Sequence, residues 1–357
     1  MDRITGQNYI IVDGKRQFTN GPPATTIPAD FLNAIQEEIM TVIAAAGITP
    51  NGSIYTQLLD ALNYLISLKV LGGRGYAMGG NTGAVSAEID GLQFSDEIAI
   101  NPAAVLSVAR ADTAGVNSSI RGYAMGGSAG AYSAEIDGLQ FSDETAINPI
   151  AVLSVARYGL AGVNSSIRGY AMGGSAGAYS TEIDGLQFSD EIAINPIAVL
   201  SVARYDTAGV NSSIRGYAMG GWTGANSAEI DGIQFSDETA INPAAVLSVA
   251  RYGTAGVNSS IRGYVMGGWT GVNSAEIDGI QFSDETAINP AAVLSVARYG
   301  TAGVNSSIRG YAMGGWTGAV SAEIDGIQFS DETAINPIAV LPVARYGSAG
   351  VQSGGVL

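Results

Sequence analysis

The sequence contains no cysteine and no histidine. Without cysteine the protein cannot form disulfides, thiolate metal sites or a cysteine nucleophile. Without histidine it can form neither a Ser-His-Asp triad nor a histidine metal site. Charged residues are also scarce, at 13% of the chain against a usual share of about 25%. We therefore expect no cofactor, and any metal ligands would have to be oxygen atoms.

Basic residues are half as numerous as acidic ones, 16 against 32, so the net charge is −16. Proteins that bind nucleic acid need clustered Lys and Arg, and we expect no nucleic-acid partner. No apolar run approaches the ~20 residues of a membrane span, and residues 1–6 do not begin a signal peptide, so no membrane insertion is expected. Hydrophobic residues make up 46% of the chain and glycine 49 of 357 residues, which indicates a folded, turn-rich protein.

The tripeptide Arg-Gly-Tyr recurs every 47 residues, starting at Arg74, Arg121, Arg168, Arg215, Arg262 and Arg309. A period of this length with strand-like content is typical of propeller blades. Helical repeats are disfavoured because every unit contains several glycines and a proline. We therefore divide the chain into residues 1–73 and 74–357. For the second part we predict a mainly β fold, a six-bladed β-propeller whose blades start near these arginines.

Each unit is predicted to contain four antiparallel strands, as the fourth unit illustrates. Residues 227–235 alternate polar and apolar side chains, which is the period of a half-buried strand. Residues 208–212 and 216–221 form the two inner strands, and residues 239–242 form the outer one. Alternate connections of an antiparallel blade share an end. The loop after the glycine pair and the crossover to the next blade should therefore lie on one face.

The ring needs one inner strand more than the segments between the units supply. Five copies start at Ala114, Ala161, Ala208, Ala255 and Ala302. The tail at residues 349–353 matches the missing copy, whereas residues 66–73 match it poorly. We predict that the tail pairs with residues 75–80 and completes the first blade, which removes an open sheet edge.

Short motifs accompany each repeat. In the fourth unit they are the apolar strand ending in Gly220-Gly221, the Ser-x-Glu-Ile-Asp segment at 227–231, the Asp237-x-Thr239 turn, and Arg251 before the next Ala-Gly-Val strand. With these motifs the unit resembles a kelch repeat. Ile241 replaces the family's outer-strand tryptophan, and Phe235 replaces its third-strand tyrosine. The resemblance covers all six units and implies a kelch-like propeller.

Residues 1–73 lack the repeat. The segment 13–16 is predicted as a turn between two short strands. Pro28 opens one helical pattern, which ends at Gly47, and Ser53 opens a second. The apolar stripes of the two helices consist of Phe31, Ile35, Ile39 and Val42, and of Leu58, Leu62 and Leu65. So short a segment cannot bury both stripes alone. We expect these seven residues to form an attachment or oligomer interface in a small, helical N-terminal domain.

Two strings in this segment, FLNAIQEEI at 31–39 and TQLLDAL at 56–62, flank an Ala-x-Gly-Ile-Thr-Pro stretch at 45–50. With them the segment resembles the N-terminal attachment region of phage and prophage tail-fibre proteins. This resemblance covers about a fifth of the chain. It implies a virion-tail protein, made in the host cytoplasm and usually a homotrimer. Its N-terminus would dock on tail or baseplate proteins, and its C-terminal part would meet the host.

Every unit carries a Glu-x-Asp pair and an Asp-Glu pair, such as Glu229 with Asp231 and Asp237 with Glu238. Two carboxylates could cleave a glycosidic bond, but catalysis needs one asymmetric site rather than six equal copies. We expect these acids to make turn hydrogen bonds and to pair with the two arginines of each unit, and we predict no enzyme. A calcium site of carboxylates and carbonyls stays open, although no EF-hand spacing is present.

The aromatic residues gather in two places of the repeat. Trp222, Trp269 and Trp316 follow the glycine pair, and Tyr132 and Tyr179 lie in the same loop of other units. A tyrosine follows the crossover arginine in five units: Tyr158, Tyr205, Tyr252, Tyr299 and Tyr346. These rings could pack between blades. They could also serve as binding platforms, since Tyr and Trp are enriched at hot spots and can stack on sugar rings. We take all of them except Tyr346 as candidate receptor-binding residues.

The sequence thus predicts a tail-fibre component that docks through residues 1–73 and binds a bacterial surface glycan or protein through its propeller. Two alternatives stay open. A polysaccharide-degrading tail enzyme would be favoured by one asymmetric acidic pocket. A purely structural tail or baseplate component would be favoured by a smooth, aromatic-poor face.

Overall fold

The structure is a computed structural model that describes residues 9–12, 15–18, 35–42, 58 and 73–353. The chain divides into two units, residues 1–69 and 70–357, and each is described by itself. In the first unit, β1 (Tyr9–Val12) and β2 (Lys15–Phe18) form an antiparallel hairpin. The hairpin confirms the predicted pair of strands, but Lys15 and Arg16, which are predicted to lie in the turn, belong to β2.

A short helix covers residues 35–42, inside the first predicted helix. Ile39 is 37% exposed on it, while Ile35 and Val42 are half-buried, as is Leu58. The other members of the predicted interface, Phe31, Leu62 and Leu65, lie outside the described residues, as does most of the second predicted helix.

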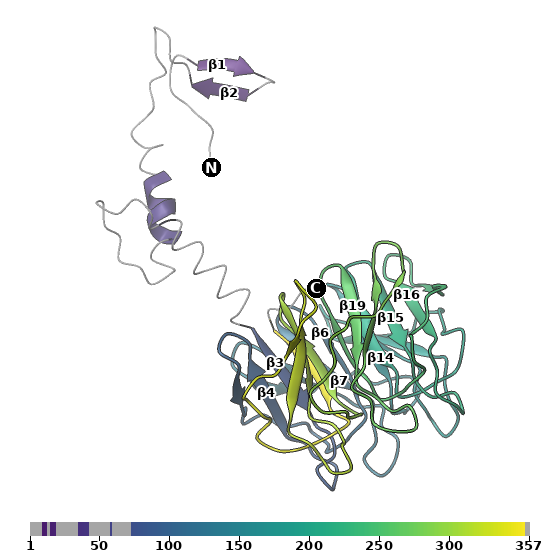
Figure 1. Ribbon diagram of the computed structural model, residues 1–357. Coiled ribbons are helices and arrows are strands. Elements are labelled where there is room, and N and C mark those ends of the chain that lie inside the picture. The colour runs from purple at the N-terminus through teal and green to yellow at the C-terminus, as the bar shows by residue number, and fades with distance from the viewer. Residues whose placement is uncertain (1–8, 13–14, 19–34, 43–57, 59–72, 354–357) are drawn as a thin grey trace. The chain divides into compact units, whose positions relative to one another are not determined.

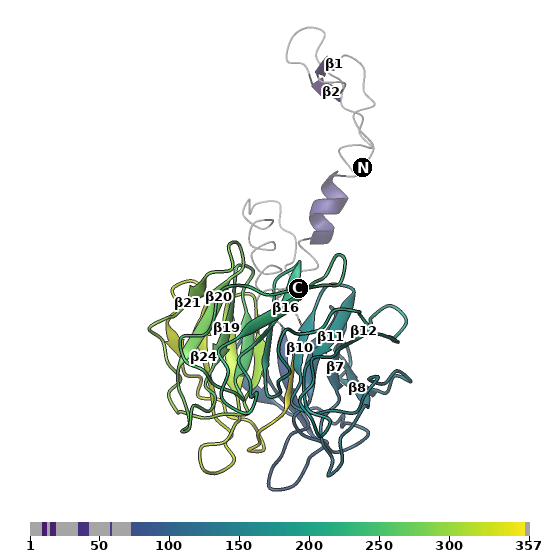
Figure 2. The same ribbon diagram turned by 90° about the vertical axis from the view of Figure 1, so that its right-hand side faces the viewer.

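The second unit is a six-bladed β-propeller (Figures 1 and 2), and each blade is a four-stranded antiparallel sheet. The predicted blade count and strand order are confirmed. The innermost strands are β26 (Ala349–Gln352), β6 (Ala114–Asn117), β10 (Ala161–Asn164), β14 (Ala208–Asn211), β18 (Ala255–Asn258) and β22 (Ala302–Asn305). The second strands are β3 (Arg74–Met78), β7 (Arg121–Met125), β11 (Arg168–Met172), β15 (Arg215–Met219), β19 (Arg262–Met266) and β23 (Arg309–Met313).

Only the outermost strand of each blade is short. The third strands are β4 (Ile89–Gln93), β8 (Ile136–Gln140), β12 (Ile183–Gln187), β16 (Ile230–Gln234), β20 (Ile277–Gln281) and β24 (Ile324–Gln328). The outer strands are β5 (Ile98–Ile100), β9 (Thr145–Ile147), β13 (Ile192–Ile194), β17 (Thr239–Ile241), β21 (Ala287–Ile288) and β25 (Ala334–Ile335). Outer strands of two or three residues offer little free edge to another chain.

The C-terminal strand closes the ring as the sequence predicts. β26 pairs antiparallel with β3, with Ala349 opposite Met78 and Gln352 opposite Gly75. The first blade therefore combines the beginning and the end of the propeller sequence. This pairing holds the two ends of the ring together without a covalent link.

Glycine allows the innermost strands to approach one another around the axis. Each carries one glycine at the same position, and a Cβ there would collide with the backbone carbonyl of the next strand's glycine. Gly115 meets Gly350 in this way, so the closing strand belongs to the same close-packed ring. Any larger residue at these positions would force two blades apart.

The core lies between blades rather than within them. Tyr76 of the first blade stacks on Phe141 of the second, with ring centroids 5.8 Å apart. Five equivalent Tyr–Phe pairs have centroids 5.6 to 5.9 Å apart. Val351 of the closing strand is fully buried in the same cluster as Tyr76. Phe235 belongs to one of these pairs, stacked on Tyr170.

Candidate functional site

The propeller has two different faces, and connections alternate between them along each blade. The loop after the glycine pair meets the incoming crossover, as the bridge between Trp222 and Tyr205 shows. We call the face with these loops and crossovers the crossover face. The opposite face carries the Ser-Ser-Ile and Ser-Asp-Glu turns and is called the turn face. The predicted sharing of one face by loop and crossover is confirmed.

On the turn face, acidic residues hold neighbouring blades together. Oε1 of Glu144 accepts hydrogen bonds from Arg74 Nη1 at 2.7 Å and from the Tyr76 hydroxyl at 2.9 Å, across the blade boundary. Burial, followed by the hydrogen bond to Glu144, raises the pKa of Tyr76. Asp143 accepts hydrogen bonds from the backbone and hydroxyl of Thr145 in the adjoining turn. These acids have the structural role that the sequence predicts.

A second arginine is fully buried in each crossover. Arg157 Nη1 lies 2.8 Å from the Asp184 carboxylate, and Arg157 Nε donates to the Gly173 carbonyl at 2.8 Å. The equivalent pairs are Arg110–Asp137, Arg204–Asp231, Arg251–Asp278, Arg298–Asp325 and Arg345–Asp90. A buried charge needs such a partner, because removing one member commonly costs ~3–5 kcal/mol. These carboxylates therefore have a structural role in each blade.

The candidate aromatic residues lie on the crossover face in five ring pairs. Each pair joins a loop ring of one blade to the crossover tyrosine that leads into the next. The pairs are Tyr132–Tyr158, Tyr179–Tyr205, Trp222–Tyr252, Trp269–Tyr299 and Trp316–Tyr346, with centroids 5.3 to 5.7 Å apart. All ten rings keep part of their surface exposed, and Tyr132 and Tyr179 are 45% and 40% exposed. They therefore pack between blades and face solvent at once.

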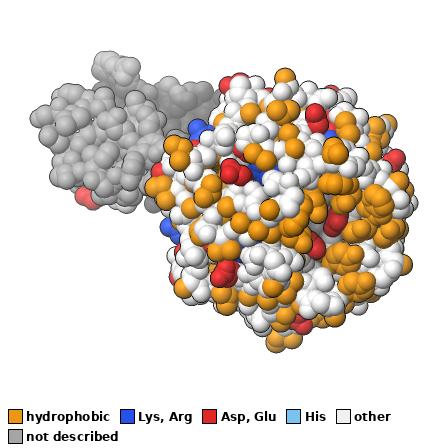
Figure 3. All heavy atoms as spheres, turned by 60° about the horizontal axis from the view of Figure 1, so that its bottom comes forward, with side chains coloured by type: hydrophobic (Ala, Val, Ile, Leu, Met, Phe, Trp, Pro, Cys, Tyr) orange, Lys and Arg blue, Asp and Glu red, His pale blue; other side chains and the backbone are white. Residues whose placement is uncertain are grey.

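The sequence analysis did not recognise that the loop ring of a pair can come from either of two positions. In the second and third blades Ser128 and Ser175 stand where later blades carry tryptophan, and the loop ring comes instead from Tyr132 and Tyr179, four positions on. Only the first blade has no aromatic pair, because its loop carries Asn81 and Val85 and its crossover carries Ala111. Figure 3, which brings the lower side of Figure 1 forward, shows hydrophobic side chains spread widely among few charged ones.

The crossovers enclose the mouth of a central channel. Asp112, Gly159, Asp206, Gly253, Gly300 and Gly347 form a closed ring in which each backbone N–H donates to the carbonyl of the preceding member, at 2.6 to 2.9 Å. All six have positive φ, between 52° and 67°. This conformation favours glycine, so the two aspartates occupy positions that glycine fills in the other four crossovers.

Asp112 and Asp206 are the functional candidates that sequence reasoning missed. Burial raises the pKa of both carboxyl groups, and the charge of Asp112 raises that of Asp206 further. The pKa of Tyr205 is raised to about 12, first by burial and then by Asp206. The signal was in the sequence: these are the only acids in residues 74–357 outside the four repeated acidic positions.

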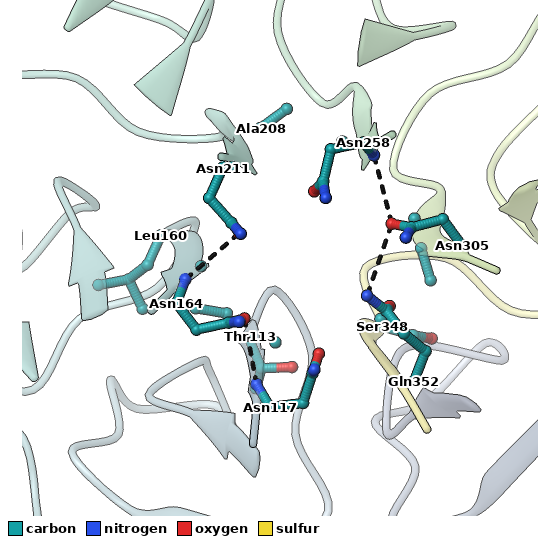
Figure 4. A pocket seen from close by; sticks show the side chains of 18 of the residues that line it. Thr113, Asn117, Leu160, Asn164, Ala208, Asn211, Asn258, Asn305, Ser348 and Gln352 are labelled. Carbon is teal, nitrogen blue, oxygen red and sulfur yellow. Dashed lines mark hydrogen bonds between the residues drawn. The ribbon is translucent and has the colours of Figure 1, made fainter. Parts of the chain in front are cut away.

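The channel behind this mouth is polar. Its cavity of about 110 Å³ is lined by the innermost strands and by Thr113, Thr207, Thr254 and Thr301. Their hydroxyl oxygens are buried and have no hydrogen-bond partner within the part of the chain that the structure describes. At the turn-face end, five asparagines and Gln352 surround the opening (Figure 4), and the backbone N–H of Asn117 donates to Asn164 Oδ1 at 3.3 Å.

Within the described residues, no group of three or more His, Cys, Asp or Glu side chains could hold a metal ion. The helices among them are also too short or too polar to cross a membrane. Searches of family models and of curated proteins found no match to this chain.

Proposed function

We propose that the protein is a tail-fibre component of a phage virion, with kelch-like blades, that binds a glycan receptor on the bacterial surface through its crossover face. The observation that carries this proposal is the set of five aromatic pairs exposed on one face. Aromatic faces give large, rigid contact area for sugar rings at low entropic cost. A purely structural component has no need for such rings on an open surface.

The N-terminal unit supports the attachment part of the proposal through its apolar residues. Ile39 is exposed on the helix at 35–42, and its face would be covered by neighbouring copies or by a tail protein. A homotrimer would present three crossover faces to one cell. Individually weak sites then gain avidity, because the second and third binding events become intramolecular.

One observation favours a polysaccharide-degrading enzyme as the second candidate. Asp112 and Asp206 occur in only two of the six crossovers, and both lie at one channel mouth. Together they form an asymmetric acidic pocket of the kind that such an enzyme requires. Burial raises the pKa of Asp112 to about 6 and that of Asp206 to about 8, and a glycosidase likewise holds one carboxylate ionised and the other protonated. Measuring new reducing ends after incubation with host polysaccharide separates the candidates. We expect none above the level of an Asp112→Asn/Asp206→Asn variant.

Adsorption of the purified protein to host cells tests the receptor-binding proposal. We expect saturable binding that soluble host glycan competes away. The proposal fails if the full-length protein does not adsorb to any host cell from which its phage is recovered.

A further inference from the structure

All unpaired charges of the described propeller are negative. Each of its twelve arginines forms an ion pair with Asp or Glu. The acids left over are two in each unit, at the positions of Glu135 and Asp143, together with Asp112 and Asp206; the exception is Glu88, which lies 3.3 Å from Arg345. The backbone of Glu135 adjoins the glycine pair, so its carboxylate lies at the crossover-face end. That face therefore repels anionic ligands and attracts cationic ones.

Two of these acids lie close together at the channel mouth. The ring of six backbone hydrogen bonds uses the N–H and C=O groups there, which leaves side chains to contact a ligand. Asp112 and Asp206 occupy alternate ring positions, with Gly159 between them. A Cβ on Gly159 would come within 2.5 Å of Asp206 Oδ1, so the carboxylate lies over this glycine. Neither carboxylate is neutralised by an arginine within the described residues.

Two further sets of side chains fit an ammonium group. Tyr158, Tyr205, Tyr252, Tyr299 and Tyr346 directly precede ring residues and surround the mouth, and tyrosine faces attract ammonium ions. Below the ring, the threonine hydroxyls that line the cavity are less than 9% exposed and have no hydrogen-bond partner among the described residues. Such buried acceptors point to a polar occupant that can donate hydrogen bonds.

The donor set favours an organic ammonium group over a metal ion. Calcium takes six to eight oxygen ligands, whereas the mouth offers two carboxylates. A primary ammonium group has three N–H donors, two of which suit Asp112 and Asp206 at alternate positions of the six-membered ring, while the third is free for a water molecule. The hollow at the mouth, about 80 Å³, has room for such a group with a few waters. The circle of five tyrosines around the mouth has one gap, at Ala111 beside Asp112. Through this gap a sugar chain could enter from the side.

We propose that the channel mouth on the crossover face binds a primary ammonium group, and that the receptor glycan therefore contains an amino sugar without an acetyl group. This inference rests on the proposed receptor-binding function and specifies its ligand. The aromatic pairs would stack on neighbouring sugar rings, while Asp112 and Asp206 would select the charged unit.

Calorimetric titration of the full-length protein tests this proposal. The probes are a glucosamine tetrasaccharide and its fully N-acetylated counterpart, in which an acetamide replaces each ammonium group. At neutral pH the Asp112 carboxyl, whose pKa burial raises to about 6, is ionised, and we expect the amino form to bind at least about tenfold more tightly, because loss of a charge-assisted contact commonly costs that much. Asp112→Asn/Asp206→Asn should abolish that preference. The matched control, Asp96→Asn/Asp190→Asn, removes two charges from the turn face and should retain it. Circular dichroism checks that both variants fold.

The following results would overturn the inference. The two tetrasaccharides could bind equally, the preference could survive in Asp112→Asn/Asp206→Asn, or calcium chloride alone could bind and displace the amino sugar. None of them would affect the receptor-binding function, which adsorption to cells tests separately. If neither sugar binds while cells are still adsorbed, the ammonium site is refuted and the function stands.

Discussion

Ring closure by the C-terminal strand allows a quantitative test. Deleting residues 349–357 removes β26 and leaves β3 as an unpaired inner edge. Val351 and Ala349 are 0% and 1% exposed. Burial of a valine contributes ~1.5–3 kcal/mol, and the lost ladder hydrogen bonds contribute ~1 kcal/mol each. The total of about 5 kcal/mol is comparable with the ~5–15 kcal/mol stability of a whole domain.

We therefore expect the truncated protein to aggregate or to melt far below the full-length chain in circular dichroism. Deleting only residues 354–357 is the matched control, because it keeps all of β26. Val351→Ala should give an intermediate loss of about 2 kcal/mol from the cavity that it leaves. Equal melting temperatures for the two deletions would refute closure by β26.

Three further predictions concern assembly, pH and the turn face. Ile35→Asp/Leu58→Asp should convert the oligomer into monomers with intact propellers, and a monomeric parent in analytical ultracentrifugation would refute the proposed interface. Because burial raises the folded pKa of Asp206, the folded state binds its proton more tightly, so stability should fall as pH rises above the ordinary carboxyl pKa of about 3.9. Asp206→Asn should flatten that decline in melting temperature, and an unchanged slope would contradict it. Glu144→Gln weakens the contact with Arg74 and should cost ~1 kcal/mol in urea unfolding, whereas no loss would show that the contact is not stabilising.

Most of the propeller could be predicted because the repeat supplies the same signals six times. The glycine pair, the alternation over residues 227–235 and the tail copy at 349–353 each correspond to a strand or an end of a strand in the structure. Polar repeat positions were also interpretable, since Glu144 and Asp184 each recur beside an arginine that can balance them.

The candidate site was less predictable because its geometry depends on the ring. Nothing local in the sequence shows that Asp112 and Asp206 share a channel mouth, since that follows from hydrogen bonds between crossovers of different blades. Likewise, the contact between Trp222 and Tyr252 spans a blade boundary. Repeat analysis identifies what is shared, whereas this site is built from positions that differ between units.

The central claim is that the aromatic pairs of the crossover face bind the host receptor. It is tested most directly by changing Trp222, Trp269 and Trp316 to serine, the residue that stands at the equivalent position in the second and third blades. Loss of a hot-spot ring commonly costs ~2 kcal/mol, about thirtyfold in affinity per site. A matched control changes three fully exposed isoleucines outside the pairs to serine, namely Ile150, Ile197 and Ile338.

Adsorption to host cells and the melting temperature are measured on the same samples. The account predicts that the tryptophan variant melts within a few degrees of the parent, like the isoleucine control, but no longer adsorbs, whereas the control adsorbs normally. A folded tryptophan variant that adsorbs as the parent does would contradict the claim. Unfolding of that variant alone would contradict it too, because the rings would then serve mainly to hold the blades together.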